Sequence, residues 1–451
     1  MPTRRRLSLV RLPGTIATAI LRRRVVVVAA LLVFGGVPFG CRAGSAADWP
    51  HWRGPNRNDI TSESSGWEQG AWPLGDPAWT RNVGRGATSP IVVEGRLYTM
   101  GWNGNRDYVY CLDAATGEEL WKQSYACPKY GRRHNGDTGA YDGTTSTPSY
   151  DAATAYLYTL STDGDLNCWD TGKNGEKVWS LNLYDAYAVK QRLFVGQGLR
   201  DYGYTTSPLV YGDWVIVEVG DDEGTLMGFD RATGKRKWAS ECKDPAGHSG
   251  GLVPMTVGRV PCVAVLTLHR LLVARLDWGH EGETVATYDW ETDFANNIPT
   301  PAVSGDSVVL ISGYNISKVV RLRVGFSGVT KLWEQKYISK VCCPVIYDDH
   351  LYFAWGKLRC LDFATGEQRW EGGRFRDDSS CLVTADGRLI AFGSRSIALV
   401  ETADRSPTAY KELSLKTGVG SRQTWPHIVL ANSRLYAKDR EGNLFCFALR
   451  D

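Results

Sequence analysis

The sequence predicts an all-β protein, an eight-bladed β-propeller of four-stranded blades in which an N-terminal strand completes the last blade. Three observations lead to this prediction. A hairpin motif recurs along the chain, a recurring signal marks the start of each repeat, and the strand pattern that is missing at the C-terminus occurs near the N-terminus.

The hairpin motif is the most regular of these signals. The stretch CLDAATGEELW at residues 111–121 recurs as CLDFATGEQRW at residues 360–370, and looser copies lie at 168–179 and 229–238. A period of tens of residues indicates units that cannot bury their apolar faces alone, so the fold must be a stack of these units.

Turn chemistry explains the motif locally. Asp113 can accept hydrogen bonds from the backbone of the turn, Gly117 supplies the positive φ, and Trp121 lies on the returning strand. A second hairpin precedes the motif in most copies, as in the alternating stretches at 157–169 and 435–447. We therefore expect four short strands in each repeat.

A short signal precedes the first strand of each repeat, and most copies contain proline. Proline has no N–H to donate to a sheet, so it is tolerated at the first residue of a strand and marks where a unit begins. The eight copies are Thr88-Ser89-Pro90, Ser146-Thr147-Pro148, Thr206-Ser207-Pro208, Pro254, Pro299-Thr300-Pro301, Cys342-Cys343-Pro344, Ser380-Cys381-Leu382 and Thr424-Trp425-Pro426.

The tryptophans on the last strand of each repeat indicate the same number of units. An eighth tryptophan strand is missing at the C-terminus but is present at residues 76–83, so this strand is expected to close the ring. The predicted organisation is an export signal or anchor at 1–47, a lead-in segment at 48–75 and the propeller at 76–451. The tryptophan positions of the other seven repeats are Trp121, Trp179, Trp238, Trp290, Trp333, Trp370 and a degenerate site near Tyr410.

Together these features resemble the pyrroloquinoline-quinone-type propeller repeats found in quinoprotein dehydrogenases and in BamB, the lipoprotein of outer-membrane-protein assembly. The opening DWPHWRGPNRNDI at 48–60, followed by GRGATSPIVVEGRLYTMG at 84–101, resembles the secreted BamB-like branch. The resemblance covers nearly all of residues 48–451 and implies the fold. It says less about activity, because a tryptophan that packs between blades serves enzymes and scaffolds alike.

The first 47 residues indicate export to the periplasm or cell envelope. They contain eight arginines, no acidic residue and an apolar run at 25–36 that is shorter than the ~20 residues of a membrane-spanning helix. The small residues before Asp48 suit cleavage by signal peptidase. An uncleaved anchor and lipidation at Cys41 remain alternatives, so membrane association through this segment stays open.

Removing residues 1–47 changes the formal net charge from +3 to −5, which gives no indication of a nucleic-acid partner. We expect a monomer with a protein or peptide partner.

Ten cysteines remain after this cleavage. Those at the third-strand position of their repeats, such as Cys111 and Cys446, should be free buried thiols, whereas Cys127 and Cys242 are better placed for a disulfide. No cysteine or histidine spacing indicates a metal site, and no metal ligand is assigned.

The loops that enter each blade converge on one end of the central channel in a propeller, and here they carry mixed charge. They form either a solvated rim or a recognition surface for a peptide or a small polar ligand. The candidate residues are Arg132, Arg133, His134, Arg200, Asp201, Asn296, Asn297, Arg376, Asp377 and Arg422.

Three motifs suggest chemistry but have simpler explanations. Cys342-Cys343 resembles the adjacent cysteines of quinoprotein alcohol dehydrogenases, yet it occupies the slot that holds Ser and Thr in other repeats. The GHSGG stretch at 247–251 matches a serine nucleophile pattern, but an all-β chain offers no strand-to-helix elbow. Asp163-Gly164-Asp165 and residues 439–443 suit hairpin turns better than calcium loops.

Two classes of function follow. The first is a non-catalytic exported propeller that acts as a protein-binding scaffold, as the resemblance to BamB implies, with no cofactor and no catalytic residue. The second is a quinone-dependent dehydrogenase that oxidises alcohols or sugars and holds pyrroloquinoline quinone with calcium in its funnel. The site residues of that second family could not be matched to positions in this chain.

Overall fold

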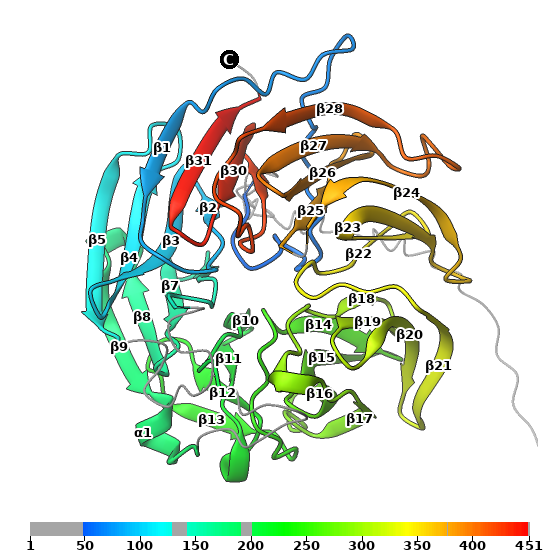
Figure 1. Ribbon diagram of the computed structural model, residues 1–451. Coiled ribbons are helices and arrows are strands. Elements are labelled where there is room, and N and C mark those ends of the chain that lie inside the picture. Colours follow the sequence, from blue (N-terminus) through cyan, green and yellow to red (C-terminus); the bar gives the residue numbers. More distant parts are fainter. Residues whose placement is uncertain (1–47, 129–141, 191–200, 377, 450–451) are drawn as a thin grey trace, which may run out of the picture. The chain divides into compact units, whose positions relative to one another are not determined.

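The computed structural model of the chain describes residues 48–449 except 129–141, 191–200 and 377. All of these residues belong to one compact unit, Gly44–Asp451, in which eight antiparallel sheets form a ring around a central channel (Figure 1). The all-β prediction and the eight-bladed propeller are confirmed. Residues 1–47, with the predicted export signal, lie outside the described residues.

The first four blades each contain four strands that follow one another in the chain. Blade 1 contains β2 (Ile91–Val93), β3 (Arg96–Asn103), β4 (Arg106–Asp113) and β5 (Glu119–Ala126); blade 2, β6 (Ser149–Asp151), β7 (Tyr156–Leu160), β8 (Asp165–Asp170) and β9 (Glu176–Asn182); blade 3, β10 (Leu209–Tyr211), β11 (Trp214–Glu218), β12 (Leu226–Asp230) and β13 (Arg236–Ala239); blade 4, β14 (Val253–Val257), β15 (Val260–Leu266), β16 (Arg270–Arg275) and β17 (Thr284–Asp289).

The last four blades complete the ring. Blade 5 contains β18 (Ala302–Ser304), β19 (Ser307–Gly313), β20 (Ser317–Gly325) and β21 (Gly328–Gln335); blade 6, β22 (Val345–Tyr347), β23 (His350–Asp362) and β24 (Gln368–Phe375); blade 7, β25 (Ser380–Val383), β26 (Arg388–Gly393), β27 (Ser396–Glu401) and β28 (Glu412–Thr417); blade 8, β29 (Val429–Ala431), β30 (Arg434–Lys438), β31 (Asn443–Ala448) and β1 (Trp79–Asn82).

Short helical turns lie among these strands. They are η1 (Thr171–Lys173), α1 (Leu183–Tyr187), η2 (Asp221–Glu223) and η3 (Asp293–Ala295). No helix in the described part of the chain is long and apolar enough to cross a membrane.

The N-terminal strand closes the ring as predicted. β1 pairs antiparallel with β31, with Trp79 opposite Cys446 and Asn82 opposite Asn443, and the two strands lie side by side in Figure 1. The first and last described parts of the propeller therefore share one sheet, and blade 8 does not leave a three-stranded edge.

Blade 6 departs from the predicted four separate strands. Its two middle positions are occupied by one 13-residue strand, β23, whose first part pairs with β22 and whose second part pairs with β24. Gly356, at φ 67°, lies between the two parts and allows the chain to turn without an intervening loop.

The recurring Asp-x-x-Thr-Gly hairpin has a second role in packing one blade on the next. Gly117 has φ 74°, and a Cβ added there would lie 2.6 Å from the ring of Trp79 in the preceding blade. Trp79 also donates its Nε1 hydrogen bond to the carbonyl oxygen of Ala114, at 3.2 Å. Asp113 accepts hydrogen bonds from the backbone of Ala115 and Thr116, as the sequence predicted. The same contact joins Trp121 to Gly175, Trp179 to Gly234 and Trp333 to Gly366.

Two tryptophans that were predicted on outer strands lie differently. Trp290 follows β17 and is 1% exposed. Trp238 lies on β13, but its indole covers Gly228 of its own blade, where an added Cβ would lie 2.2 Å away. The turn that would receive Trp238 in blade 4 lacks the Thr-Gly pair, so the ring packs within its own sheet instead.

The third-strand cysteines are free and buried, as predicted. Burial raises the pKa of Cys111 to about 11 and that of Cys446 to about 12, which leaves both as unreactive thiols at neutral pH. Cys127 and Cys242 were considered better placed for a disulfide, without an assigned partner, but both are free. Cys127 contacts the hydroxyl of Thr162 in blade 2, and Cys242 accepts a hydrogen bond from the hydroxyl of Thr225.

Replacing Trp79 tests whether its contact with blade 1 holds the ring closed. The Trp79→Ala variant loses the packing on Gly117 and the hydrogen bond to Ala114, and should lower the free energy of unfolding by about 3 kcal/mol in denaturant titrations. The matched control is Trp278→Ala, since Trp278 is 88% exposed and its loss should change stability by less than about 0.5 kcal/mol. Equal effects of the two substitutions would contradict this account of closure.

Candidate functional site

The segment that the sequence analysis treated as a lead-in lies inside the central channel. Trp49 exchanges backbone hydrogen bonds with Val92 of blade 1, and Thr61 donates to the carbonyl oxygen of Val383 in blade 7. Residues 49–61, here called the plug, therefore cross the channel between the innermost strands, and Figure 1 shows this dark blue segment inside the ring.

Two arginines attach the plug to the blades. Arg53 donates to the carbonyl oxygens of Pro344, at 2.6 Å, and Pro301, at 3.3 Å. Arg57 donates to the carbonyl oxygen of Pro208, at 2.6 Å. These prolines are the ones that mark the strand starts in the sequence, so the repeat supplies carbonyl acceptors around the channel.

A buried charge network connects the plug to blade 8. Asp59 forms an ion pair with Arg53 and lies 3.2 Å from Nδ1 of His427, and all three side chains are at most 3% exposed. Burial lowers the pKa of His427, but the charge of Asp59 and the interactions with Cys343 together outweigh burial and raise the pKa to about 10. His427 is therefore an imidazolium at neutral pH.

The plug carries a third buried cation. Burial lowers the pKa of Arg57 to about 9, which still leaves its guanidinium protonated at neutral pH. Among the described residues, Arg53 and His427 form ion pairs with Asp59. Arg57 instead donates to neutral oxygens, those of Leu252, Ser149 and Pro208. Among these described side chains the positive charges outnumber the negative one.

A cavity of about 420 Å³ lies above the plug, on the face that carries the loops between successive blades, here called the funnel face. Trp52 and His427 form its floor, with ring centroids 4.3 Å apart, and Trp52 donates from Nε1 to the hydroxyl of Thr300, at 3.0 Å. The lining residues are Trp52, Ala87, Asp142, Thr145, Tyr202, Thr205, His248, Gly250, Phe294, Asn296, Ile298, Tyr314, Lys340, Val341, Cys343, Trp425, His427 and Arg440.

Aromatic and cationic side chains meet on the cavity wall. The Nζ of Lys340 lies 5.0 Å from the ring centre of Tyr314, and the guanidinium of Arg440 lies 4.4 Å from the ring centre of Trp425. Arg440 also donates to Oε1 of Gln423, at 2.7 Å. These cations are held beside aromatic faces, which attract them through the ring quadrupole.

Acidic groups are scarce at this cavity. Asp142 is the one carboxylate among the described lining residues, and its Oδ2 forms an ion pair with Arg85, at 2.9 Å. Nε2 of His248 accepts the backbone N–H of Tyr202, at 3.2 Å. No group of three or more metal-binding side chains comes together within the part of the chain that the structure describes.

The GHSGG stretch packs against the plug. A Cβ added at Gly250 or Gly251 would lie 2.7 Å or 2.6 Å from the Trp52 indole, so both glycines allow the close approach of that ring. Ser249 is fully buried, and its carbonyl oxygen accepts the hydroxyl of Thr205. The stretch lies in the loop between β13 and β14, and it has no strand-to-helix elbow.

The adjacent cysteines differ in their surroundings. Cys343 lines the cavity, and its Sγ accepts the backbone N–H of Thr300, at 3.2 Å. Cys342 is buried beside Cys381, and its Sγ accepts the backbone N–H of Ala354, at 3.4 Å. Both thiols are free and serve as acceptors in the repeat slot.

The predicted rim residues have different positions. Five of them, Arg132, Arg133, His134, Arg200 and Asp377, lie outside the described residues. Asn296 lines the cavity, whereas Asp201 is fully buried. Arg376 and Arg422 are exposed on loops of the funnel face, and Arg422 lines a separate hollow with Arg395.

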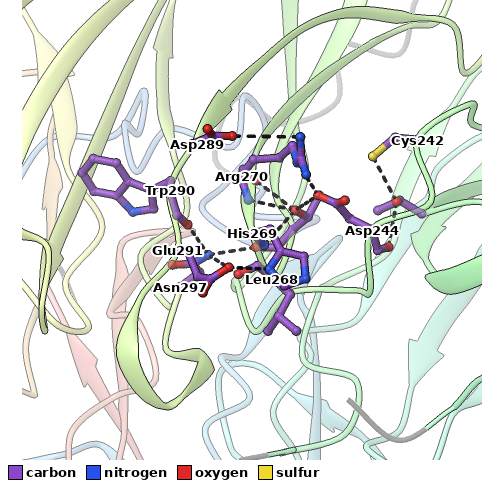
Figure 2. Close-up of polar contacts among 12 residues, drawn as sticks. Cys242, Asp244, Leu268, His269, Arg270, Asp289, Trp290, Glu291 and Asn297 are labelled. Atoms are coloured by element: carbon purple, nitrogen blue, oxygen red, sulfur yellow. Dashed lines mark hydrogen bonds and ion pairs between the residues drawn. The ribbon is translucent and has the colours of Figure 1, made fainter. Parts of the chain in front are cut away.

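Asn297 is structural. It is 2% exposed, and its amide nitrogen donates to the carbonyl oxygens of Thr267, at 2.8 Å, and Trp290, at 2.9 Å. Figure 2 shows Asn297 among residues of neighbouring loops. Its side chain is therefore not available at the rim.

Ion pairs near Asn297 also connect the loops beside the cavity. Arg270 forms an ion pair with Asp244, at 2.7 Å, and Nδ1 of His269 lies 2.7 Å from Glu291 (Figure 2). These contacts link the β13–β14, β15–β16 and β17–β18 connections, which carry His248 and Asn296 at their channel ends. The loops of blades 3 to 5 are thus tied together.

The main cavity residues were not found from the sequence. Trp52, Lys340 and the blade 8 residues His427 and Arg440 come from three separate parts of the chain and meet only around the channel. One local signal was present. The closely spaced Arg53 and Arg57 in the DWPHWRGPNRNDI stretch are charges in a segment that is otherwise rich in Trp and Pro.

Eight four-position blades closed by an N-terminal strand define this protein as a pyrroloquinoline-quinone-type β-propeller. The family model described as "Outer membrane protein assembly factor BamB" matches residues 105–372. This is more than half of the chain, and the chain belongs to that family.

Curated relatives match a smaller part. The dehydrogenase subunit of the quinone alcohol dehydrogenase of Acetobacter aceti is 32% identical over 164 residues, which are 35% of this chain and 19% of that protein. A quinohemoprotein alcohol dehydrogenase of Pseudomonas putida is 28% identical over 154 residues, 33% of this chain and 18% of that protein. The matches thus span about a fifth of these relatives.

Solved structures share the fold. BamB from Moraxella catarrhalis has a TM-score of 0.56 at 14% identity, and the superposition covers 83% of this chain and 99% of that chain. A europium-containing methanol dehydrogenase has a TM-score of 0.60 at 12% identity, with 87% of this chain and 89% of that chain covered. At such identities the likeness concerns the fold alone.

The imidazolium of His427 leads to a prediction about pH. Its pKa in the folded protein, about 10, exceeds the ordinary value of 6.5, so its stabilising effect is complete below pH 6.5 and is lost as the pH rises through about 10. His427→Gln should lower the free energy of unfolding by about 3 kcal/mol at pH 6, and by less at each step toward pH 10.

His280→Gln is the control for this measurement, because His280 is exposed and pairs with Glu283 on a surface loop. Denaturant unfolding from pH 6 to pH 10 should show little pH-dependent difference between this variant and the unmodified protein. A deficit of His427→Gln that stays constant across the range would refute the charged state of His427.

Proposed function

We propose that this protein is a non-catalytic, exported propeller that acts as a protein-binding scaffold in outer-membrane-protein assembly. Membership in the BamB family supports this proposal, as does the superposition on nearly the whole of a BamB structure. The basic and apolar segment at 1–47 supports export to the periplasm or cell envelope. A protein or peptide is the proposed partner, and a monomer the proposed state.

The observation that carries the proposal is the chemistry of the cavity. A quinone held with calcium needs several oxygen ligands and a carboxylate base close to the reacting carbon. Among the described lining residues the carboxylate present is Asp142, which is paired with Arg85, while the floor carries positive charge. The described residues do not fit calcium with a quinone, and we propose that no cofactor is bound.

The face opposite the funnel offers a surface for a partner. Trp278 is 88% exposed on the β16–β17 connection, and Phe326 is 56% exposed at the β20–β21 turn. Both connections join the third and fourth strands of neighbouring blades, so they lie at the same end of the ring. In most other blades this position holds the Thr-Gly turn, and exposed aromatic residues there are typical of protein contacts.

Site-specific photo-cross-linking in the native host tests the partner directly. A benzoylphenylalanine at position 278 should form a discrete adduct with an envelope protein of outer-membrane assembly, identified by mass spectrometry. The control position is Asn105, an exposed turn residue on the funnel face. No adduct at position 278, or the same adducts at both positions, would contradict the scaffold proposal.

Dye-linked oxidation tests the alternative, a quinone-dependent dehydrogenase. The purified protein incubated with pyrroloquinoline quinone and calcium should reduce an artificial electron acceptor no faster than background with a panel of alcohols and aldose sugars. The Cys342→Ser/Cys343→Ser variant should retain the fold and any partner adduct. Turnover in the unmodified protein that disappears in this double variant would replace the scaffold by the dehydrogenase.

A further inference from the structure

A second hollow lies on the funnel face, where blades 7 and 8 meet. It has a volume of about 500 Å³, and its walls come from the β26–β27 turn, the β28–β29 connection and strand β31. Its lining residues are all different from those of the central cavity. Two exposed arginines, Arg395 and Arg422, are among them, so this hollow carries positive charge at the surface.

Hydrogen bonds hold the two arginine-bearing segments together. Arg395 donates from Nε to the carbonyl oxygen of Gly420, at 3.0 Å, and its own carbonyl oxygen accepts the backbone N–H of Val419, at 2.9 Å. These contacts join the β26–β27 turn to the connection that carries Arg422. The Nε hydrogen bond orients the Arg395 guanidinium, and no described residue accepts from its terminal Nη1 and Nη2 groups.

The basic surface continues onto blade 6. Two further arginines are exposed at the end of β24 and directly after it, and the backbone N–H of Arg376 donates to Oγ of Ser394, at 2.8 Å, beside Arg395. Residues 48–451 have a formal net charge of −5, so a group of arginines without acids is a local departure from the rest of the protein. None of these four arginines forms an ion pair with another described residue: Arg374, Arg376, Arg395 and Arg422.

Two acidic residues of the β30–β31 turn lie beside the hollow, but neither pairs with these arginines. Asp439 is fully buried, and its carboxylate accepts the backbone N–H groups of Ser421, at 2.7 Å, and Asn443, at 3.0 Å. Glu441 pairs with Arg85, at 3.3 Å. Asp439 therefore holds the walls of the hollow in place, and its single charge leaves an excess of positive charge there.

The hollow suits a carboxylate on an apolar stem. The guanidinium group matches a carboxylate with two parallel N–H donors, and the pair is stronger than a neutral hydrogen bond. Phe445 lines the same hollow and is half-buried, so it offers an apolar contact to the methylene groups of a glutamate side chain. A single small anion would leave this contact and most of the volume unused.

A peptide fits this surface better than a membrane does. Proteins that dock on anionic lipid usually place apolar side chains next to their basic residues. The exposed large apolar side chains of the described chain lie on outer strands or at the opposite end of the ring, and none of them lines this hollow. The surface therefore has the charge for an acidic partner and lacks an apolar anchor for lipid.

We propose that the hollow between blades 7 and 8 binds an acidic peptide segment of a partner protein, with side-chain carboxylates paired to Arg395 and Arg422. Arg374 and Arg376 extend the site toward blade 6. The site gives the proposed scaffold a second contact surface, at the end of the ring opposite Trp278. Loss of peptide binding here leaves the adducts at position 278 unchanged, so the failure of this inference and the failure of the scaffold proposal are distinguishable.

Fluorescence anisotropy with the full chain and labelled peptides tests the inference. The probe is a short peptide of alternating glutamate and glycine, and the control peptide has glutamine in place of every glutamate. The acidic peptide should bind about tenfold more tightly or better, because paired guanidinium donors require the carboxylate charge. Added sodium chloride should weaken its binding, since salt screens ion pairs at the surface.

Two variants localise the binding. Arg422→Glu should weaken binding of the acidic peptide by about tenfold or more, because it replaces an attraction by a repulsion. The matched control is Arg259→Glu, which makes the same change of net charge at an exposed arginine in the β14–β15 turn, at the opposite end of the ring, and should leave binding unchanged. Thermal unfolding of both variants checks that the fold is retained.

Co-sedimentation with phosphatidylglycerol vesicles tests the membrane as the alternative partner. The protein should not sediment with these vesicles through Arg422. The inference would be overturned by equal binding of the two peptides, by no binding of either, or by equal effects of the two variants. Vesicle binding that is lost in Arg422→Glu, without binding of the acidic peptide, would identify a lipid surface instead.

Discussion

The ion pair between Arg53 and Asp59 inside the channel is the interaction on which the interior of this propeller depends. It lets a polar segment occupy the centre of the ring, because Asp59 offsets one arginine charge and also contacts His427 of blade 8. The arginine then reaches carbonyl oxygens of blades 5 and 6. Without this pair, the plug would place an uncompensated charge among buried strands.

Three of the prolines at the strand starts also contact the plug. Proline offers a carbonyl acceptor and no N–H donor, so a ring of such residues presents acceptors to the channel. Arg53 and Arg57 satisfy three of these carbonyls with guanidinium donors. Prolines at the strand starts thus also help to hold the plug in the channel.

Some interfaces between neighbouring blades repeat the same tryptophan–glycine contact, and others lack it. Where the Thr-Gly turn is present, the tryptophan of one blade covers the glycine of the next, and the interface repeats. In blade 4 and blade 5 the turn is lost, Trp238 packs within its own sheet, and Trp278 and Phe326 are exposed instead. The same ring therefore keeps a stable framework while two blades provide an altered surface, which agrees with the use of one fold for unrelated functions.

The sequence by itself determined the class of fold, the eight repeats, the hairpin turns and the closing strand at 76–83. These features depend on local rules, since Asp113, Gly117 and Trp121 act within one hairpin and their spacing is visible in the chain. The free state of the third-strand cysteines follows from the same register. Even the closure could be inferred, because a missing strand at one end matched an extra strand at the other.

Only the tertiary structure decided where the functional groups meet. Trp52 lies hundreds of residues before Lys340 and His427, and no local spacing relates the three. The charge of His427 depends on Asp59, which reaches it only because the plug enters the channel. Asn297 looked like a rim residue but binds backbone carbonyls, since burial is set by neighbouring loops and not by residue type. Contacts across a ring are fixed by closure and packing, which a linear pattern does not contain.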